Sequence, residues 1–274
     1  ASELISEYEK GDTAIADLLS KVKLVVLPCV NPDGYEAATN GTGVIANKKL
    51  YFATCNNCEV FQTKSNARGV DLNRNFPSFS ASLLWKEKKE DTYLIKTYRN
   101  SHYFAGDTLG SEKETRVTMN FLMKYIPVSF RYVDFHSVGR CIYAGKPHLS
   151  DQFNNACLKT GALISSITKY DLLELDEENT GEGTDGSITD FAAEVAAGFV
   201  YNPVIGRLAP TDSVHNVRKT EMFNYQCSVN TVETLNSLVK DKKSNSLEVS
   251  TPQMHVNEWE KYHLYHLFLT LLKE

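Results

Sequence analysis

The chain has 274 residues, of which 42% are apolar and 23% charged, and its formal net charge is −5. A chain of this length forms one large domain or two small ones, and its apolar content is sufficient for a full core. The mildly acidic balance excludes a basic nucleic-acid-binding protein. No apolar run approaches the roughly 20 residues that a membrane-spanning helix needs, so we expect no membrane span.

The cysteines give an indication of the cellular compartment in which the protein resides. Six cysteines are present, and Cys55 and Cys58 form a CxxC pair. One such pair, with no second cysteine or histidine pair nearby, favours disulfide bonding in an oxidising compartment over a zinc knuckle. A glycosylation sequon begins at Asn40. These features predict a secreted or extracellular protein with disulfide bonds, although the first ten residues are typical of an amphipathic helix and not of a signal peptide.

The first elements expected along the chain are a helix and a strand. Residues 1–20 place apolar side chains at helical spacing, and residues 22–30 form a nearly continuous apolar run of strand length. The run stops at the tetrapeptide NPDG, residues 31–34, which is a strong turn signal. A strand that is apolar on both faces is typical of the centre of a parallel sheet, where ligands gather beyond the carboxyl ends of the strands.

The middle of the chain alternates helical and strand patterns. Within residues 111–127 we expect a helix that opens with a capping box between Ser111 and Glu114, runs to about Tyr125 and is followed by Pro127. Residues 130–135 predict a strand ending at His136. Because such alternation is typical of α/β proteins, we expect that fold class.

The remaining elements are expected to follow the same scheme. Residues 151–169 predict a helix, whereas the acidic, glycine-rich residues 171–187 predict a surface loop. Residues 188–200 are mixed, with an Ala-rich turn. The tail from 258 to 272 carries an apolar stripe at helical spacing.

Four segments carry a family resemblance, in the order LPCVNPDGYE (27–36), GVDLNRNF (69–76), YFAGDTLGSEKET (103–115) and VDFHSVGRCIYAG (133–145). Taken together they resemble the zinc carboxypeptidases, in that family's order. The resemblance implies an α/β fold with a mixed, largely parallel central sheet and helices on both faces. It also implies Zn²⁺ as cofactor and the C-terminus of a peptide or protein as substrate.

His136 is the best-supported metal ligand. It ends an apolar strand, where a zinc ligand can project from a rigid element into a crevice. A lone histidine at a strand end is more often structural, but the flanking motifs favour the metal. Asn73 and Arg74 occupy the positions that hold the substrate's terminal carboxylate in the family, and a guanidinium beside an amide suits that ligand.

The other metal ligands are expected at the far end of the chain. His255 and Glu258 form the chain's HxxE sequence, which resembles the family's metal motif, but in the family that motif precedes NPDGY. One interpretation is a circular permutation, in which residues 1–274 form a single domain and segment 245–274 precedes residue 1 in family order. The other is a linear, truncated chain, either a fragment or a protein that lacks two metal ligands, in which HxxE occurs by chance.

The resemblance also places the remaining site residues. The segment SVNTVET, residues 228–234, resembles the strand with the family's catalytic glutamate, which would be Glu233. Asn47 stands where the family has an arginine that polarises the scissile carbonyl. No tyrosine lies just before GTDGSITDF (183–191), where the family has a mobile one. Ile188 resembles the pocket residue of enzymes that prefer apolar C-terminal side chains, whereas the nearby Asp185 and Asp190 favour basic ones.

Two functions follow from these features. One is a zinc-dependent carboxypeptidase that removes C-terminal residues from peptides. The alternative is a catalytically inactive relative that binds peptide C-termini or a protein partner, and it is motivated by Asn47 and the missing tyrosine.

Overall fold

The computed structural model describes residues 2–40, 64–81, 104–129, 131–137, 141–173, 186–210 and 221–227. The helices are α1 (Ser2–Glu9), α2 (Thr13–Lys21), α3 (Pro32–Asn40), α6 (Lys113–Tyr125), α7 (Asp151–Thr168) and α9 (Ile188–Ala196), with short 3-10 helices η3 (Leu72–Arg74) and η4 (Ile126–Val128). The strands are β1 (Arg131–Ser137), β2 (Cys141–Ala144), β3 (Asp171–Leu172), β4 (Val200–Asn202), β5 (Arg207–Ala209) and β6 (Glu221–Cys227).

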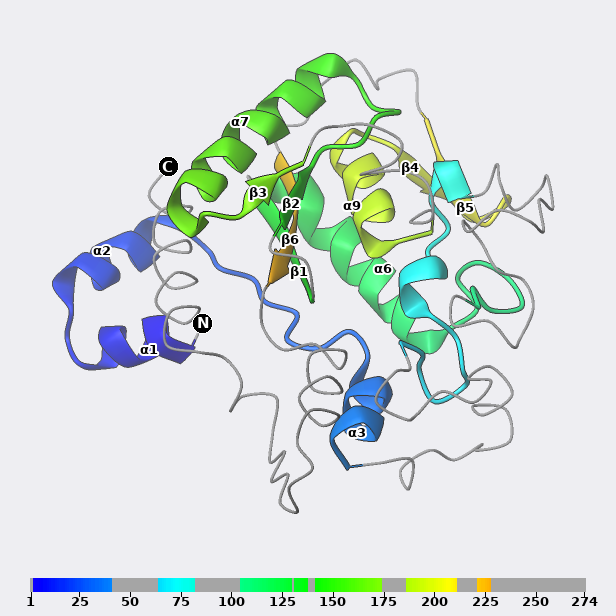
Figure 1. Cartoon of the computed structure of the whole chain (residues 1–274), viewed down its shortest axis with the longest axis horizontal. Coiled ribbons are helices and arrows are strands. Elements are labelled where there is room, and N and C mark those ends of the chain that lie inside the picture. The colour runs from blue at the N-terminus through cyan, green and yellow to red at the C-terminus, as the bar shows by residue number, and fades with distance from the viewer. Residues whose placement is uncertain are drawn as a thin grey trace, which may run out of the picture.

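A mixed sheet occupies the centre of the described chain. Its strand order is β1-β6-β2-β3. The β1–β6 and β2–β3 pairs are parallel, and the β2–β6 pair is antiparallel. Helices α7 and α9 both contact β6, and in Figure 1 they lie on opposite sides of the strands. The α/β fold with a mixed, largely parallel sheet and helices on both faces is therefore confirmed.

The main apolar core fills the space between the sheet and helices α6, α7 and α9. Its fully buried side chains include Leu122 of α6, Ile142 of β2, Ile164 of α7 and Phe191 of α9. Phe191 packs against Phe76, with ring centroids 5.9 Å apart. Through Phe76, the loop that follows η3 is tied to the core.

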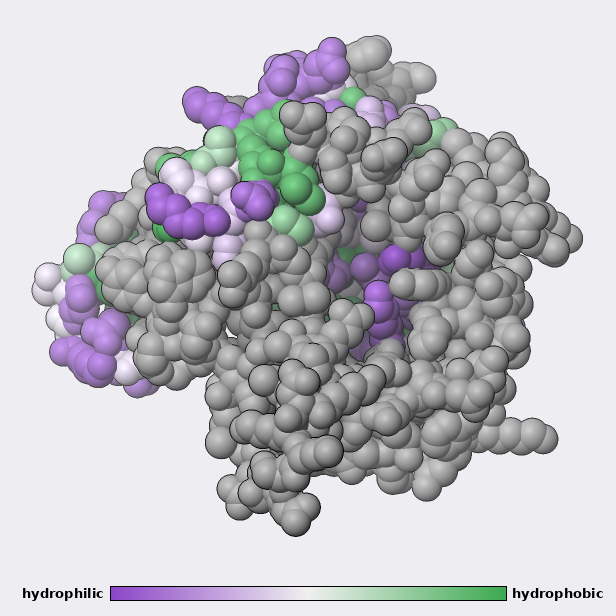
Figure 2. Space-filling model, in the orientation of Figure 1, coloured by the Kyte–Doolittle hydropathy of each residue, from purple (hydrophilic) through white to green (hydrophobic). Residues whose placement is uncertain are grey.

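The amino-terminal helix predicted over residues 1–20 is divided in two. Gly11 adopts a φ of +84°, which ends the first helix, and the side chain of Asp12 accepts hydrogen bonds from the N–H groups of Ala14 and Ile15 to begin the second. The outer surface over α1 and α2, at the left of Figure 2, is rich in hydrophilic residues. None of the described helices is long and apolar enough to cross a membrane.

The strand predicted over residues 22–30 is wrong. No described strand pairs with this segment, and Val26 is 50% exposed. The turn predicted at residues 31–34 is wrong as well, because Pro32 begins α3. A proline is pre-organised for the first helical position, and Asn31 Oδ1 accepts a hydrogen bond from the Gly34 N–H at 3.0 Å.

The elements after residue 110 agree better with the predictions from the sequence. The strand ending at His136 and the helix over 151–169 are confirmed as β1 and α7. The helix expected from residue 111 exists as α6, but its capping box is wrong. Glu112 is the N-cap residue, with no side-chain cap, and the Ser111 hydroxyl donates to Glu112 Oε1 at 2.7 Å.

Residues 188–200 also differ from expectation. They form the regular helix α9 and the first residue of β4, which pairs antiparallel with β5. The last residues of the predicted surface loop, Gly186 and Ser187, are buried, because they dock onto the chain after η3.

Candidate functional site

His136 lies near the carboxyl end of β1, one residue before the strand ends. Asp134 is two residues earlier and therefore projects from the same face of the strand. Its carboxylate oxygen Oδ2 lies 2.7 Å from His136 Nε2. An ionised carboxylate can only accept, so Nε2 donates the hydrogen bond. In the neutral imidazole this hydrogen bond selects the tautomer in which Nδ1 has the lone pair.

The surroundings of His136 are strongly charged. Burial by itself lowers the pKa of His136, but the charge of Asp134, its hydrogen bond and the charge of Asp71 outweigh burial and the opposing charge of Arg74, so the pKa is raised. The charges of Asp71 and Arg74 act on His136 across the fold. The turn that contains Asn73 and Arg74 is therefore near enough to the end of β1 for its charges to affect the pKa of His136.

That turn is built around Asp71. Asp71 is 2% exposed, and its Oδ1 accepts the backbone N–H of Asn73 at 3.0 Å, which starts η3. Arg74 is also buried, and its Nη1 donates to the Asn73 carbonyl oxygen at 2.8 Å. The sequence-predicted carboxylate-binding pair is thus held on a short, fixed turn.

The residues around His136 are suited to a cation. Asp71 Oδ2 is buried and accepts no hydrogen bond from the described residues, and the charge of this carboxylate is one of the causes that raise the pKa of His136. A histidine whose far nitrogen donates to a carboxylate is the usual form of a zinc-binding imidazole. Within the described ranges, no three His, Cys, Asp or Glu side chains are grouped to hold a metal.

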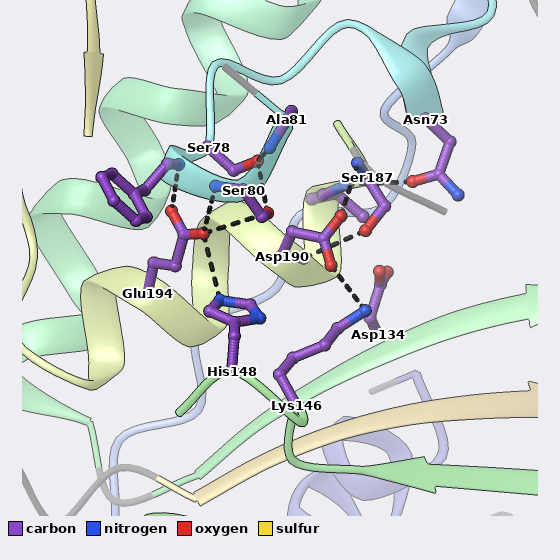
Figure 3. Close-up of polar contacts among 12 residues, drawn as sticks. Asn73, Ser78, Ser80, Ala81, Asp134, Lys146, His148, Ser187, Asp190 and Glu194 are labelled. Carbon is purple, nitrogen blue, oxygen red and sulfur yellow. Dashed lines mark hydrogen bonds and ion pairs between the residues drawn. The ribbon is translucent and has the colours of Figure 1, made fainter. Parts of the chain in front are cut away.

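Helix α9 lies directly against the turn. The backbone N–H of Ile188 donates to Asn73 Oδ1 at 3.0 Å (Figure 3). The Phe76 N–H donates to the Gly186 carbonyl oxygen at 2.9 Å. Ile188 itself is 5% exposed and belongs to the core. The structure therefore brings three of the predicted site residues, Asn73, Arg74 and Ile188, into one unit.

Asp190 is already engaged by other groups. Its Oδ2 accepts the Ser187 N–H at 3.1 Å as part of a capping box, and its Oδ1 lies 2.5 Å from Lys146 Nζ (Figure 3). Both charged side chains are almost fully buried. Because Lys146 balances its charge, Asp190 does not offer a free carboxylate for a basic substrate side chain.

A second buried carboxylate lies one turn further along α9. Glu194 is fully buried and accepts hydrogen bonds from the N–H groups of Phe79 and Ser80 at 2.6 and 3.1 Å. His148 Nε2 lies 3.2 Å from the same carboxylate (Figure 3). Asp190 and Glu194 thus fasten α9 to two other segments of the chain.

Several predicted site residues lie outside the described residues. These are Asn47, Asp185, Glu233, His255 and Glu258, together with Cys55 and Cys58. The cysteine side chains described, those of Cys29, Cys141 and Cys157, are thiols.

Sequence reasoning missed the partners that surround the site. Asp134 could have been found from its spacing of two from His136 on a strand. Asp190 and Glu194 stand four apart in the otherwise apolar segment ITDFAAEVA, and buried carboxylates in such a helix require partners. No comparable signal marks Lys146, whose pairing depends on the tertiary fold.

Comparison with known proteins identifies the family. Residues 1–197 match the family model described as zinc carboxypeptidase. The carboxypeptidase N catalytic chain of Homo sapiens is 37% identical over 86 residues, which cover 31% of this chain and 16% of that protein. Carboxypeptidase B of Helicoverpa zea is 32% identical over 168 residues, which cover 59% of this chain and 34% of that protein.

The matched regions are parts of longer proteins. The chain spans about a third or less of the length of these two relatives. A crystal structure of carboxypeptidase A from Helicoverpa armigera aligns with a TM-score of 0.47 at 17% identity, over 88% of this chain and 48% of that chain. Since the family model covers well over half of the sequence, the chain belongs to the zinc carboxypeptidase family.

Proposed function

We propose that this protein is a zinc-dependent carboxypeptidase that removes C-terminal residues from peptides. The observation that carries the proposal is that the predicted carboxylate-binding pair and the predicted pocket residue form one fixed unit, since Asp71 Oδ1 accepts the Asn73 N–H and Asn73 Oδ1 accepts the Ile188 N–H, both at 3.0 Å. A carboxypeptidase needs such a unit, because the terminal carboxylate and the side chain of the last residue must be bound together. Family membership supports the same activity.

The proposed metal ligands are His136, His255 and Glu258. Zn²⁺ bound there would acidify a water molecule and polarise a carbonyl group. The contact of Asp134 Oδ2 with His136 Nε2 would hold the neutral imidazole in the tautomer that leaves Nδ1 available for the metal. The two distant ligands require residues 245–274 to reach the end of β1, and we propose that they do so within a single domain spanning residues 1–274, with this segment taking the place that precedes residue 1 in family order.

The proposed roles of the chain's own residues are substrate binding, proton transfer and side-chain selection. Arg74 and Asn73 hold the terminal carboxylate through charge-assisted hydrogen bonds, which fix the last peptide bond in position. Glu233 accepts the proton of the attacking water and passes it to the leaving amine. Ile188 favours apolar C-terminal side chains, and the pairing of Asp190 with Lys146 argues against a preference for basic ones.

One feature favours a second function, a catalytically inactive protein that binds peptide C-termini or a protein partner. Asn47 replaces the arginine expected to polarise the scissile carbonyl. An amide donates a hydrogen bond but carries no charge, and loss of one such electrostatic group costs about 10²–10³ in rate. The carboxylate-binding pair would remain competent in such a protein. The compartment we propose in either case is extracellular, from the cysteines and the sequon.

The experiment that tests the proposal compares two peptides with the full chain. One ends in a free carboxylate and the other in an amide, with the same apolar last residue. The proposal predicts release of that residue from the first peptide only, loss of release with a zinc chelator, recovery with added Zn²⁺, and no release by Glu233→Gln. Tighter binding of the carboxylate peptide without release would establish the inactive binding protein instead, and equal binding of both peptides without release would contradict both functions.

A further inference from the structure

The side-chain amide of Asn73 is held at a defined orientation by helix α9. Its Oδ1 accepts the Ile188 backbone N–H at 3.0 Å (Figure 3). A backbone N–H can donate only to the oxygen of an amide, so this contact distinguishes the two ends of the side chain. Nδ2, the donor end, must lie on the side away from Ile188. The hydrogen bonds of Asn73 to the described residues use its backbone and Oδ1 and leave Nδ2 for another acceptor.

The start of α9 is itself fixed in place. Ser187 and Asp190 form a reciprocal capping box, and Lys146 pairs with Asp190. Gly186 has a φ of +83°, and a Cβ added there would lie 2.5 Å from the Arg74 carbonyl oxygen. This close approach of two backbones leaves little freedom between α9 and the turn that contains Asn73.

We propose that the Ile188 N–H is a positioning group, which holds the Asn73 amide with Nδ2 turned towards the terminal carboxylate of the substrate. The consequence for substrate rests on the proposed function, whereas the orientation of Asn73 does not. Asn73 is pinned at its backbone by Asp71 and at its side chain by Ile188. The donor is therefore oriented before substrate arrives, which reduces the entropy lost on binding.

The chain offers a variant that removes this one donor. Ile188 is the first residue of α9, a position where proline is well tolerated because its N–H is not needed by the helix. Ser187 has φ −73° and ψ 158°, which is the conformation that a residue before proline prefers. Ile188→Pro therefore keeps the helix start. Ile188→Val is the matched control, since it keeps the N–H and a β-branched apolar side chain.

The first experiment measures discrimination between a peptide with a free C-terminal carboxylate and the same peptide with a C-terminal amide, by calorimetric titration of the full chain. We expect Ile188→Pro to reduce the ratio of the two affinities about tenfold, because that is the effect of losing one hydrogen bond to a charged group. Ile188→Val should keep the wild-type ratio. Asn73→Ala should reduce the affinity ratio as much as Ile188→Pro does. The double variant should show no larger reduction than either single variant, because both changes remove the same interaction. Additive losses, or an unchanged ratio in Ile188→Pro, would overturn the inference.

A second measurement needs neither substrate nor a folded proline variant. Hydrogen exchange of the Ile188 amide, followed by NMR, should be slow in the wild-type chain and in Asn73→Asp, which still accepts. It should accelerate at least about tenfold in Asn73→Leu, which does not accept. Equal protection in Asn73→Leu would overturn the orientation itself. If the wild-type chain does not distinguish carboxylate from amide peptides while the exchange result holds, the proposed function is wrong and the orientation stands.

Discussion

Lys146 Nζ lies 2.5 Å from Asp190 Oδ1, and the two side chains are only 9% and 4% exposed. This ion pair joins the loop that follows β2 to the first turn of α9, the helix whose start holds Asn73. A buried ion pair adds little to the free energy of unfolding when it is compared with apolar residues in both positions. The loss of only one partner, however, leaves an uncompensated buried charge.

Lys146→Met should therefore destabilise the protein strongly. Removing one partner of a buried pair costs about 3–5 kcal/mol in the free energy of unfolding. Urea unfolding of the single variants and of Lys146→Met with Asp190→Asn measures the effect. The double variant should recover part of the loss, and a double variant as unstable as the sum of the two single ones would show that the two residues do not interact.

Arg74→Lys should weaken substrate binding although the charge is kept. Lysine cannot form the two parallel hydrogen bonds that a guanidinium makes with a carboxylate. We expect kcat/KM for peptides with a free C-terminus to fall about tenfold or more, mainly through KM, in steady-state assays. The control is Arg68→Lys, at an exposed arginine whose Nη1 lies 3.4 Å from Glu112. A fall of equal size in both variants would contradict a specific role for Arg74.

Asn47→Arg should increase the rate of peptide hydrolysis. The family resemblance puts Asn47 where a cation polarises the scissile carbonyl, so a guanidinium there should raise kcat by about 10²–10³ with little change in KM. Steady-state kinetics on one peptide measure both constants. Lys48→Arg is the matched control, because it introduces a guanidinium at the next position without changing the net charge. An unchanged kcat in Asn47→Arg would show that position 47 does not face the reacting carbonyl.

Cysteine reactivity tests the packing of β2. Burial raises the pKa of the Cys141 thiol, and the charge of Asp171 adds to this although a hydrogen bond with Tyr143 opposes it. A raised pKa means that less reactive thiolate is present at neutral pH. In native protein treated with iodoacetamide and mapped by mass spectrometry, the exposed Cys29 should be alkylated well before Cys141. Similar rates for both cysteines in the native state, with Cys141 labelled no faster after denaturation, would contradict the buried position.

The sequence predicts those elements whose signals are local. The strand that ends at His136 and the helix over 151–169 are confirmed as β1 and α7, because the spacing of apolar residues and the residues at the element ends define them. The apolar run at 22–30 has the composition of a strand, but pairing requires a neighbour, and no described strand lies in register with it. The spacing of Ser111 and Glu114 predicts a capping box, whereas the Ser111 hydroxyl is bonded to the adjacent Glu112.

The candidate site is predictable only in part for the same reason. Asn73, Arg74, His136 and Ile188 stand in contiguous motifs. The groups that orient them come from distant segments: Ile188 is 115 residues from its partner Asn73, and Asp190 pairs with Lys146 of another loop. Composition and spacing carry no information about such contacts, which arise only when α9 packs against the turn after residue 71.

The position of a bound zinc ion decides whether His136, His255 and Glu258 form one metal site. Crystals of the full chain grown with Zn²⁺ should give an anomalous difference peak at the zinc edge, about 2.0–2.2 Å from one ring nitrogen of His136, one of His255 and a carboxylate oxygen of Glu258. That result would establish the metal centre and the contribution of segment 245–274 to it. A chain in which His255 and Glu258 lie far from His136, with no zinc peak between them, would contradict the proposed site.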